Sequence, residues 1–133
     1  YSDLKAVYDN SLIRVAGEFK DFKILLVTGI ANPKPLKKYI VENISKNIQV
    51  LEYSDHYDFK ESDFKDIEKK IENLDFDSKI IITTEKDAMR LKKFSNIANN
   101  LKELFFYIPI QVEFLNNQAD NFNQQIIEYV RKN

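Results

Sequence analysis

Residues 24–33 read ILLVTGIANP. Four apolar residues in a row, ending at Thr28-Gly29, are typical of a strand that is buried on both faces of a parallel sheet. Asn32 is a suitable helix cap, and proline at the next position fits the first turn of a helix. The helix would bury one stripe of side chains and end near residues 46–47; the stripe is Leu36, Ile40 and Ile44. The stretch therefore predicts a buried strand followed by an amphipathic helix.

The same alternation of strand and helix recurs along the chain. Three further strands are predicted, over residues 48–53, 80–82 and 104–108. Asp58 and Glu61 have the spacing of a capping box and predict the start of a second helix. Thr84 predicts the cap of a third, short helix. A last helix is indicated by the spacing of Phe122, Ile126 and Tyr129.

Strand–helix alternation with apolar central strands predicts an α/β fold. We expect a three-layer, Rossmann-like domain over residues 23–133, with a mainly parallel sheet of at least four strands. Residues 1–22 fit this pattern poorly and are expected to form an interdomain linker or an edge segment. Because the chain begins with Tyr1 and not with Met, we expect it to be a piece of a larger protein.

Composition excludes several classes of function. The 133 residues carry 20 Lys and Arg against 21 Asp and Glu, so no excess of cations favours a nucleic-acid partner. The chain has no cysteine, which excludes disulfides and thiolate zinc sites and fits a reducing, cytoplasmic compartment. No apolar run reaches the roughly 20 residues of a transmembrane helix. Two glycines, Gly17 and Gly29, are too few for a phosphate-binding P-loop or a dinucleotide fingerprint.

Polar and ionisable residues gather where three predicted strands end. In a parallel sheet the carboxyl ends of the strands share one edge, and ligands bind there. The segments that follow the strands are residues 28–35, 54–59 and 83–87. We therefore expect these three loops to form the functional edge of the domain.

His56 is the only histidine in the chain. It is either an exposed loop residue flanked by acids or a proton-transfer residue, with Asp55 or Asp58 as the carboxylate that orients the ring. In the third loop, Lys86 would meet a phosphate at the start of a helix, or simply pair with a neighbouring acid. No metal site is assigned, because no recognisable spacing of ligands is present.

Taken together, the three loops resemble a known family. Residues 27–33, residues 55–59 and residues 83–88, the last followed by Arg90-Leu91, are similar to the carboxyl-terminal half of tetraacyldisaccharide 4'-kinase, an enzyme of lipid A and lipopolysaccharide biosynthesis. The resemblance covers roughly residues 20 to 110. Tyr57 departs from it, because many members carry a second histidine at this position.

The resemblance implies transfer of the ATP γ-phosphoryl group to the 4'-hydroxyl of a tetraacyldisaccharide 1-phosphate, with Mg²⁺. It also implies an amino-terminal P-loop domain of the same polypeptide, which would hold ATP, Mg²⁺ and a catalytic aspartate. His56 would partner that aspartate, and Asp55 would hold the imidazole ring. The remaining candidate residues would line the nucleotide or interdomain cleft: Gly29, Asn32, Thr83, Thr84, Glu85, Lys86 and Asp87.

The same resemblance implies that this chain alone is inactive. It places the parent enzyme at the cytoplasmic face of the bacterial inner membrane, where the lipid A precursor is its substrate. An alternative from another class stays open. The chain would then be a stand-alone α/β module that binds a small anionic ligand or a protein partner through the same edge.

Overall fold

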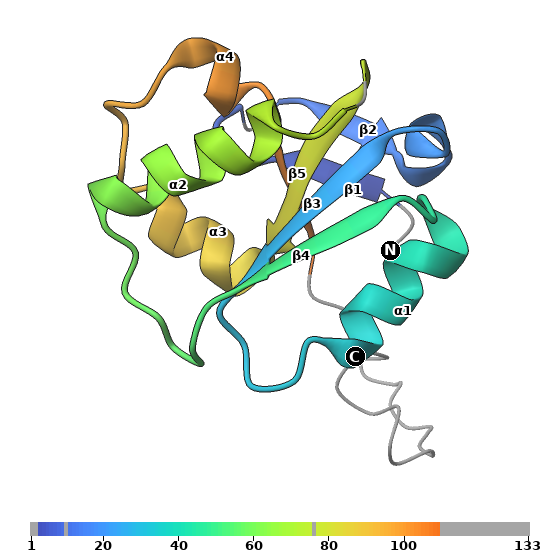
Figure 1. Cartoon of the computed structure of the whole chain (residues 1–133), viewed down its shortest axis with the longest axis horizontal. Helices are drawn as coiled ribbons and strands as arrows, with labels where there is room; N and C mark the ends of the chain where they lie inside the picture. Colours follow the sequence, from blue (N-terminus) through green and yellow to red (C-terminus); the bar gives the residue numbers. More distant parts are fainter. Residues whose placement is uncertain (1–2, 10, 76, 110–133) are drawn as a thin grey trace.

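A computed structural model describes residues 3–9, 11–75 and 77–109. A six-stranded sheet lies at its centre, with helices on both faces (Figure 1). The elements follow in the order β1 (Asp3–Ala6), β2 (Ile13–Val15), η1 (Ala16–Phe19), β3 (Lys23–Thr28), α1 (Lys34–Asn43), β4 (Ile48–Glu52), α2 (Glu61–Glu72), β5 (Lys79–Thr84), α3 (Glu85–Leu91), α4 (Asn99–Lys102) and β6 (Phe105–Ile108).

The sheet is mainly parallel, as the sequence predicts. Its strand order is β2-β1-β6-β5-β3-β4, and the last four strands run parallel to one another. The central strand β3 pairs with β4 on one side and β5 on the other, with Leu26 opposite both Val50 and Ile82. Strand β4 lies at the edge and is only partly buried, in agreement with its more polar sequence.

Alternating side chains of β3 and β5 supply two separate cores. On one face, Leu26 and Ile82 pack with Ile40 of α1. On the other face, apolar residues of β3 and β5 pack with Ile67 of α2 and Leu91 of α3. Two helical layers around one sheet make the three-layer α/β arrangement, and the loops that follow β3 and β4 lie at the same edge of the sheet as the start of α3 (Figure 1).

The first strands extend the sheet at the other edge. Strand β1 pairs antiparallel with β6, with Lys5 opposite Tyr107, and β2 pairs antiparallel with β1. Leu4 and Phe19 are buried against the same core as α1. The described part of residues 1–22 thus lies at an edge of the sheet, and the placing of a domain boundary at residue 22 stays a prediction.

Helix boundaries differ in part from the sequence expectations. The capping box of Asp58 and Glu61 is wrong: α2 begins at Glu61, and the carboxylate of Asp63 accepts the backbone N–H of Lys60 at 2.8 Å. The reason is the burial of Phe59, which is 3% exposed and keeps this part of the chain out of the helix.

Helix α1 begins at Lys34 with Pro33 as its N-cap, so the expectation that Asn32 caps the helix is wrong. Asn32 precedes the cap, and its side-chain oxygen accepts the backbone N–H of Lys34 at 3.3 Å. The helix ends at Asn43, earlier than expected. The helix predicted around Phe122 and Ile126 lies outside the described residues.

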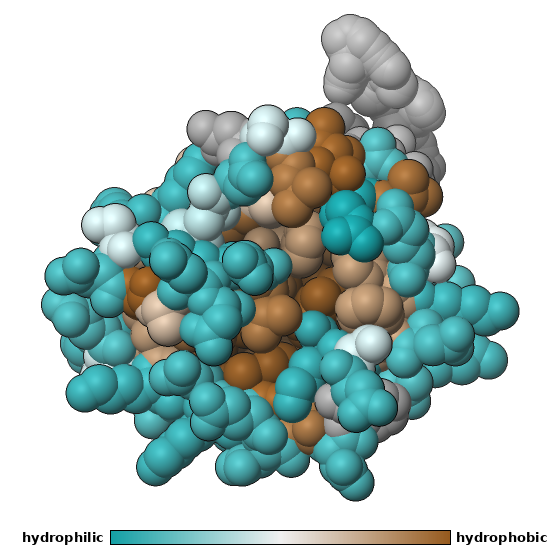
Figure 2. All heavy atoms as spheres, turned by 90° about the horizontal axis from the view of Figure 1, so that it is seen from above, coloured by the Kyte–Doolittle hydropathy of each residue, from teal (hydrophilic) through white to brown (hydrophobic). Residues whose placement is uncertain are grey.

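No helix in the described part of the chain is both long enough and apolar enough to span a membrane. Polar and charged side chains cover much of the face seen in Figure 2, and they surround a central group of apolar side chains.

Candidate functional site

The loops after β3, β4 and β5 meet at the carboxyl edge of the parallel strands. Backbone hydrogen bonds join the first two: Tyr53 donates to the carbonyl of Thr28 at 2.7 Å, and His56 donates to the carbonyl of Gly29 at 3.0 Å. The backbone N–H of Gly29 donates to a carboxylate oxygen of Asp87 at 2.9 Å, which joins the first loop to the third. The parallel sheet therefore brings together the segments that the sequence singles out.

Asp87 is the centre of these contacts. Its side chain is fully buried, and the hydroxyl of Thr84 donates to its Oδ2 at 2.8 Å. Thr84 in turn caps α3 by accepting the backbone N–H of Asp87 at 3.0 Å. On the other oxygen, Arg90 Nη1 donates to Oδ1 at 3.2 Å, so the buried charge is paired. Asp87 therefore holds two loops and the start of a helix together.

Glycine is required at position 29 because neighbouring atoms lie close to where a Cβ atom would be, and not because of an unusual backbone φ angle. A Cβ atom at this position would lie 3.1 Å from the carbonyl oxygen of Ser54, 3.2 Å from Cβ of Tyr57 and 3.3 Å from Oδ1 of Asp87. The first of these neighbours is backbone and cannot move without moving the loop that carries His56. Glycine at this position thus sets the distance between the first two loops.

His56 is the one non-glycine residue with positive φ, at 60°, among the described residues. A side chain in this left-handed conformation is unfavourable and persists only when its surroundings hold it. The imidazole ring is 64% exposed, with Nε2 3.6 Å from Oδ2 of Asp55. Of the two flanking acids considered as ring partners, Asp55 is therefore the one in ion-pair range.

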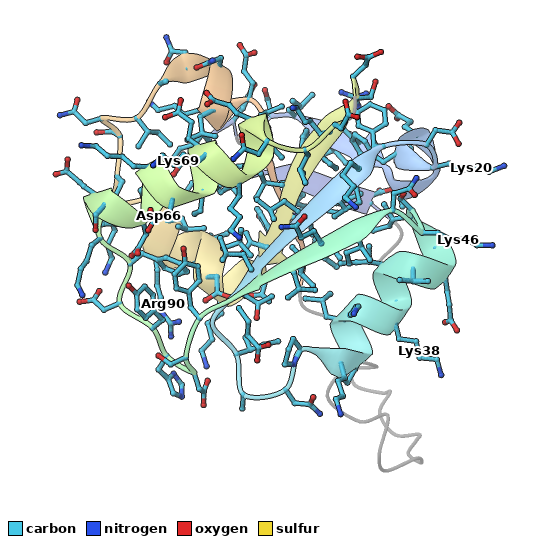
Figure 3. The ribbon with its side chains drawn as sticks, viewed as in Figure 1. Lys20, Lys38, Lys46, Asp66, Lys69 and Arg90 are labelled. Carbon is cyan, nitrogen blue, oxygen red and sulfur yellow. The ribbon has the colours of Figure 1, made fainter. Side chains whose placement is uncertain are left out.

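Arg90 connects His56 to the buried acid, and the sequence did not single it out as a site residue. It extends from α3 (Figure 3), and its Nη2 lies 3.3 Å from Nδ1 of His56 while Nη1 contacts Asp87. The available signal was its position three residues after Asp87 on a helix, which places the two side chains on one face. Its contact with His56 spans 34 residues and has no signature in the sequence.

Aromatic side chains support the loop that carries His56. Tyr53 and Tyr57 stack with ring centroids 4.6 Å apart, and both contact Phe59 edge-on. The hydroxyl of Tyr57 donates to Asp63 at 3.1 Å, which raises the pKa of this phenol. Burial, reinforced by Asp63, raises the pKa of Tyr53 to about 12. Both phenols stay neutral near pH 7, so both rings serve in packing, Tyr57 also donates a hydrogen bond, and neither exchanges protons.

The other candidate residues lie in different surroundings. Thr83 is fully buried, and its hydroxyl, like that of Thr28, has no hydrogen-bond partner among the described residues. Glu85 is partly buried and Lys86 exposed in the first turn of α3. Asn32 lines a surface hollow of 370 Å³ to which His56 does not contribute; the lining is Ala31, Asn32, Pro33, Lys34, Lys37, Val50 and Glu52.

The described residues contain no group of three or more His, Cys, Asp or Glu side chains that could hold a metal ion. What the geometry does contain is a single exposed imidazole at the open edge of the sheet, held by backbone, a carboxylate and a guanidinium. An imidazole so placed can exchange a proton with a group, or donate a hydrogen bond to a group, that approaches this edge from outside the domain.

Comparison with known proteins identifies the family. The sequence model of the Tetraacyldisaccharide-1-P 4'-kinase family matches residues 4–131. The chain is 38% identical over 137 aligned positions to the tetraacyldisaccharide 4'-kinase of Bacteroides fragilis, covering all of this chain and 36% of that protein. It is 42% identical to the kinase of Bacteroides thetaiotaomicron, covering 83% of this chain and 29% of that protein. With the kinase of Phocaeicola vulgatus the identity is also 42%, over 86% of this chain and 31% of that protein.

No solved structure matches the chain. The chain spans about a third of the length of the curated relatives it matches. The family match extends over nearly all of the chain, and therefore over the three loops whose residues meet around Asp87 and His56. The chain belongs to the tetraacyldisaccharide 4'-kinase family.

Proposed function

We propose that this chain is the carboxyl-terminal domain of a lipid A kinase that transfers the γ-phosphoryl group of ATP to the 4'-hydroxyl of a tetraacyldisaccharide 1-phosphate. The observation that carries the proposal is His56, an exposed imidazole held in a strained backbone conformation at the open edge of the sheet. The family match supports the reaction, and the share of each relative that is covered supports a second domain beyond this chain.

The residues of this chain do not fit a complete site for ATP and Mg²⁺. Neither glycine lies in a P-loop sequence, and the described acids form no three-ligand cluster. In our proposal an amino-terminal P-loop domain of the same polypeptide holds both, and ATP bound with Mg²⁺ supplies the phosphoryl group and its charge neutralisation. The edge residues Gly29, Asn32, Thr83, Thr84, Glu85, Lys86 and Asp87 would then face or support the cleft between the domains.

In this proposal the described residues have different roles. Asp87, with Gly29 and Thr84, keeps the loops at fixed separation. His56 projects from the edge and meets a carboxylate of the other domain, which it orients near the acceptor hydroxyl, while Asp55 restrains the ring. Phosphoryl transfer depends mainly on positioning and electrostatic stabilisation, and domain closure brings separately held groups together. On this basis the isolated chain is inactive and cytoplasmic, and the full enzyme works at the membrane face that presents its lipid substrate.

The proposal is tested in the full-length kinase that contains this chain. We expect His56→Ala to lower turnover of tetraacyldisaccharide 1-phosphate by about 10²- to 10⁴-fold, the usual contribution of a positioned proton-transfer group. The free energy of unfolding should change by less than about 0.5 kcal/mol, because the ring is exposed. Ser54→Ala, an exposed change in the same loop, is the matched control and should keep the wild-type rate.

Two outcomes would contradict the proposal. A folded His56→Ala enzyme with wild-type turnover would remove His56 from the reaction. A gene that encodes no P-loop sequence upstream of Tyr1 would favour the stand-alone binding module. In that case a thermal-shift screen of the chain against small anionic metabolites should find one that clearly stabilises it.

A further inference from the structure

We infer that Arg90 is a positioning residue that fixes which nitrogen of the His56 ring carries the proton, an inference that rests on the proposed role of His56. A guanidinium is always a hydrogen-bond donor and cannot accept. Because Arg90 Nη2 lies 3.3 Å from Nδ1 of His56, Nδ1 must act as the acceptor in this contact. The neutral ring then carries its hydrogen on Nε2, the nitrogen on the opposite side.

The position of the Arg90 side chain is itself fixed by its contact with the buried Asp87. Its Nη1 donates to Oδ1 of Asp87 at 3.2 Å, and that carboxylate is fully buried and held by Gly29 and Thr84. The guanidinium is partly buried, with a side-chain exposure of 22%, and its planar fork uses different nitrogens for the two contacts. The buried carboxylate of Asp87 thus fixes the orientation of the Arg90 guanidinium. The guanidinium in turn fixes the orientation of the His56 ring, which is otherwise exposed.

Nε2 is the nitrogen of the His56 ring that remains available to contact a group from outside the domain. It lies 3.6 Å from Oδ2 of Asp55, a distance at which the carboxylate attracts the N–H but does not form a short hydrogen bond with it. Asp55 is 47% exposed, so its side chain can move away from Nε2 when a second carboxylate approaches the edge of the sheet. His56 therefore offers an N–H from Nε2 to an incoming acid, and Arg90 prevents the ring from presenting Nδ1–H in its place.

The tautomer can be measured directly, because His56 is the only histidine in the chain and its ring nitrogens need no assignment by mutation. We expect ¹⁵N spectra of the 133-residue chain, recorded at a pH where the ring is neutral, to show Nδ1 unprotonated and Nε2 protonated. In Arg90→Met a measurable share of the Nδ1–H form should appear. Lys93→Met removes an exposed cation just past α3 and should leave the balance unchanged.

Arg90→Lys guards against a loss of folding, since an ammonium keeps a positive charge beside Asp87 but cannot serve both contacts with a planar fork. We expect this variant to be folded by thermal unfolding and to show a tautomer balance between those of wild type and Arg90→Met. An unchanged balance in both Arg90 variants would overturn the inference.

Kinetics of the full-length enzyme then separate positioning from a general structural role. We expect Arg90→Met to lower kcat about tenfold with unchanged KM for ATP, and Arg90→Lys to recover part of the rate. The double variant with His56→Ala should be no slower than His56→Ala alone, because Arg90 acts through the ring. A further loss in the double variant would overturn the inference. Full activity of His56→Ala would instead remove the proposed function, while the tautomer measurement would still decide the Arg90 contact.

Discussion

Two regions of the same edge, the Asp87 cluster and the His56 loop, are built in opposite ways. The Asp87 cluster consists of Asp87, Gly29, Thr84 and Arg90, and its central carboxylate has no exposed surface and three side-chain or backbone donors. The His56 loop, residues 54–59, presents an imidazole that is 64% exposed. Within the described part of the chain, the side-chain contacts of this ring are the longer ones to Arg90 and Asp55.

The difference teaches how a rigid domain can present an accessible reactive group. Favourable contacts are concentrated on Asp87, where no ligand can reach, and the unfavourable backbone conformation is placed at His56, where a ligand can. Strain of this kind survives only where neighbouring contacts over-determine it. We therefore expect changes at the buried Asp87 to act mainly on stability and changes in the loop to act mainly on activity. Arg90 contacts both regions, so changes there should affect both.

The largest effect on stability is expected from Asp87→Ala. It removes the partner of Arg90, of the Thr84 hydroxyl and of the Gly29 N–H at once. Breaking a buried ion pair by removing one partner typically costs about 3–5 kcal/mol. Denaturant unfolding measures the loss, with Asp66→Ala, an exposed acid on α2 (Figure 3), as a control expected within about 0.5 kcal/mol of wild type. Equal stability of the two variants would contradict the contrast between cluster and loop.

An intermediate effect is expected from Gly29→Ala. The new Cβ would lie 3.1 Å from the backbone oxygen of Ser54, so the loop must shift, at a cost of about 1–3 kcal/mol for an overpacked site. Because this contact joins the cluster to the His56 loop, activity of the full-length enzyme should fall with stability.

Gly17→Ala supplies the matched control for that change. A Cβ at Gly17 meets nothing within 4 Å, so this variant should be as stable as wild type or more stable by about 0.4–1 kcal/mol. Thermal unfolding of both variants measures the difference in stability between Gly29→Ala and Gly17→Ala. A Gly29→Ala domain as stable as Gly17→Ala would show that the two loops are not held at the distance described.

The contrast between the two regions also explains what the sequence could and could not predict. Uninterrupted apolar runs predicted three of the four parallel strands, β3, β5 and β6, because burial on both faces leaves no polar alternation. The fourth, β4, has a more polar sequence and lies at the edge of the sheet, where it is only partly buried. Thr84 was predicted as a cap because capping is local in sequence, and the structure confirms it. The burial of Asp87 was not predicted, because it depends on the approach of Gly29, which is 58 residues away along the chain.

Competing local signals explain the wrong helix start. Asp58 with Glu61 and Lys60 with Asp63 both place an acid three residues after a possible cap, and spacing alone cannot choose between them. The choice depends on Phe59, which packs edge-on against Tyr53 and Tyr57 and is buried before the helix begins. Capping patterns thus predict that a helix starts, whereas tertiary packing decides the residue.

The smallest expected effect tests the strain at His56 itself. At φ 60° a Cβ atom is disfavoured by about 1–2 kcal/mol, a penalty that glycine does not incur. We therefore expect His56→Gly to unfold at a free energy about 1 kcal/mol higher than His56→Ala, although both lack the imidazole and should be equally slow as kinases. Ser54, the residue two positions earlier, has no positive φ, so there Ser54→Gly should be less stable than Ser54→Ala by roughly 0.5–1 kcal/mol. If alanine is at least as stable as glycine at position 56 as well, the left-handed backbone is not imposed by the surrounding loops. The division between a stabilising cluster and a strained loop would then lose its physical basis, because the exposed ring would be an ordinary loop side chain.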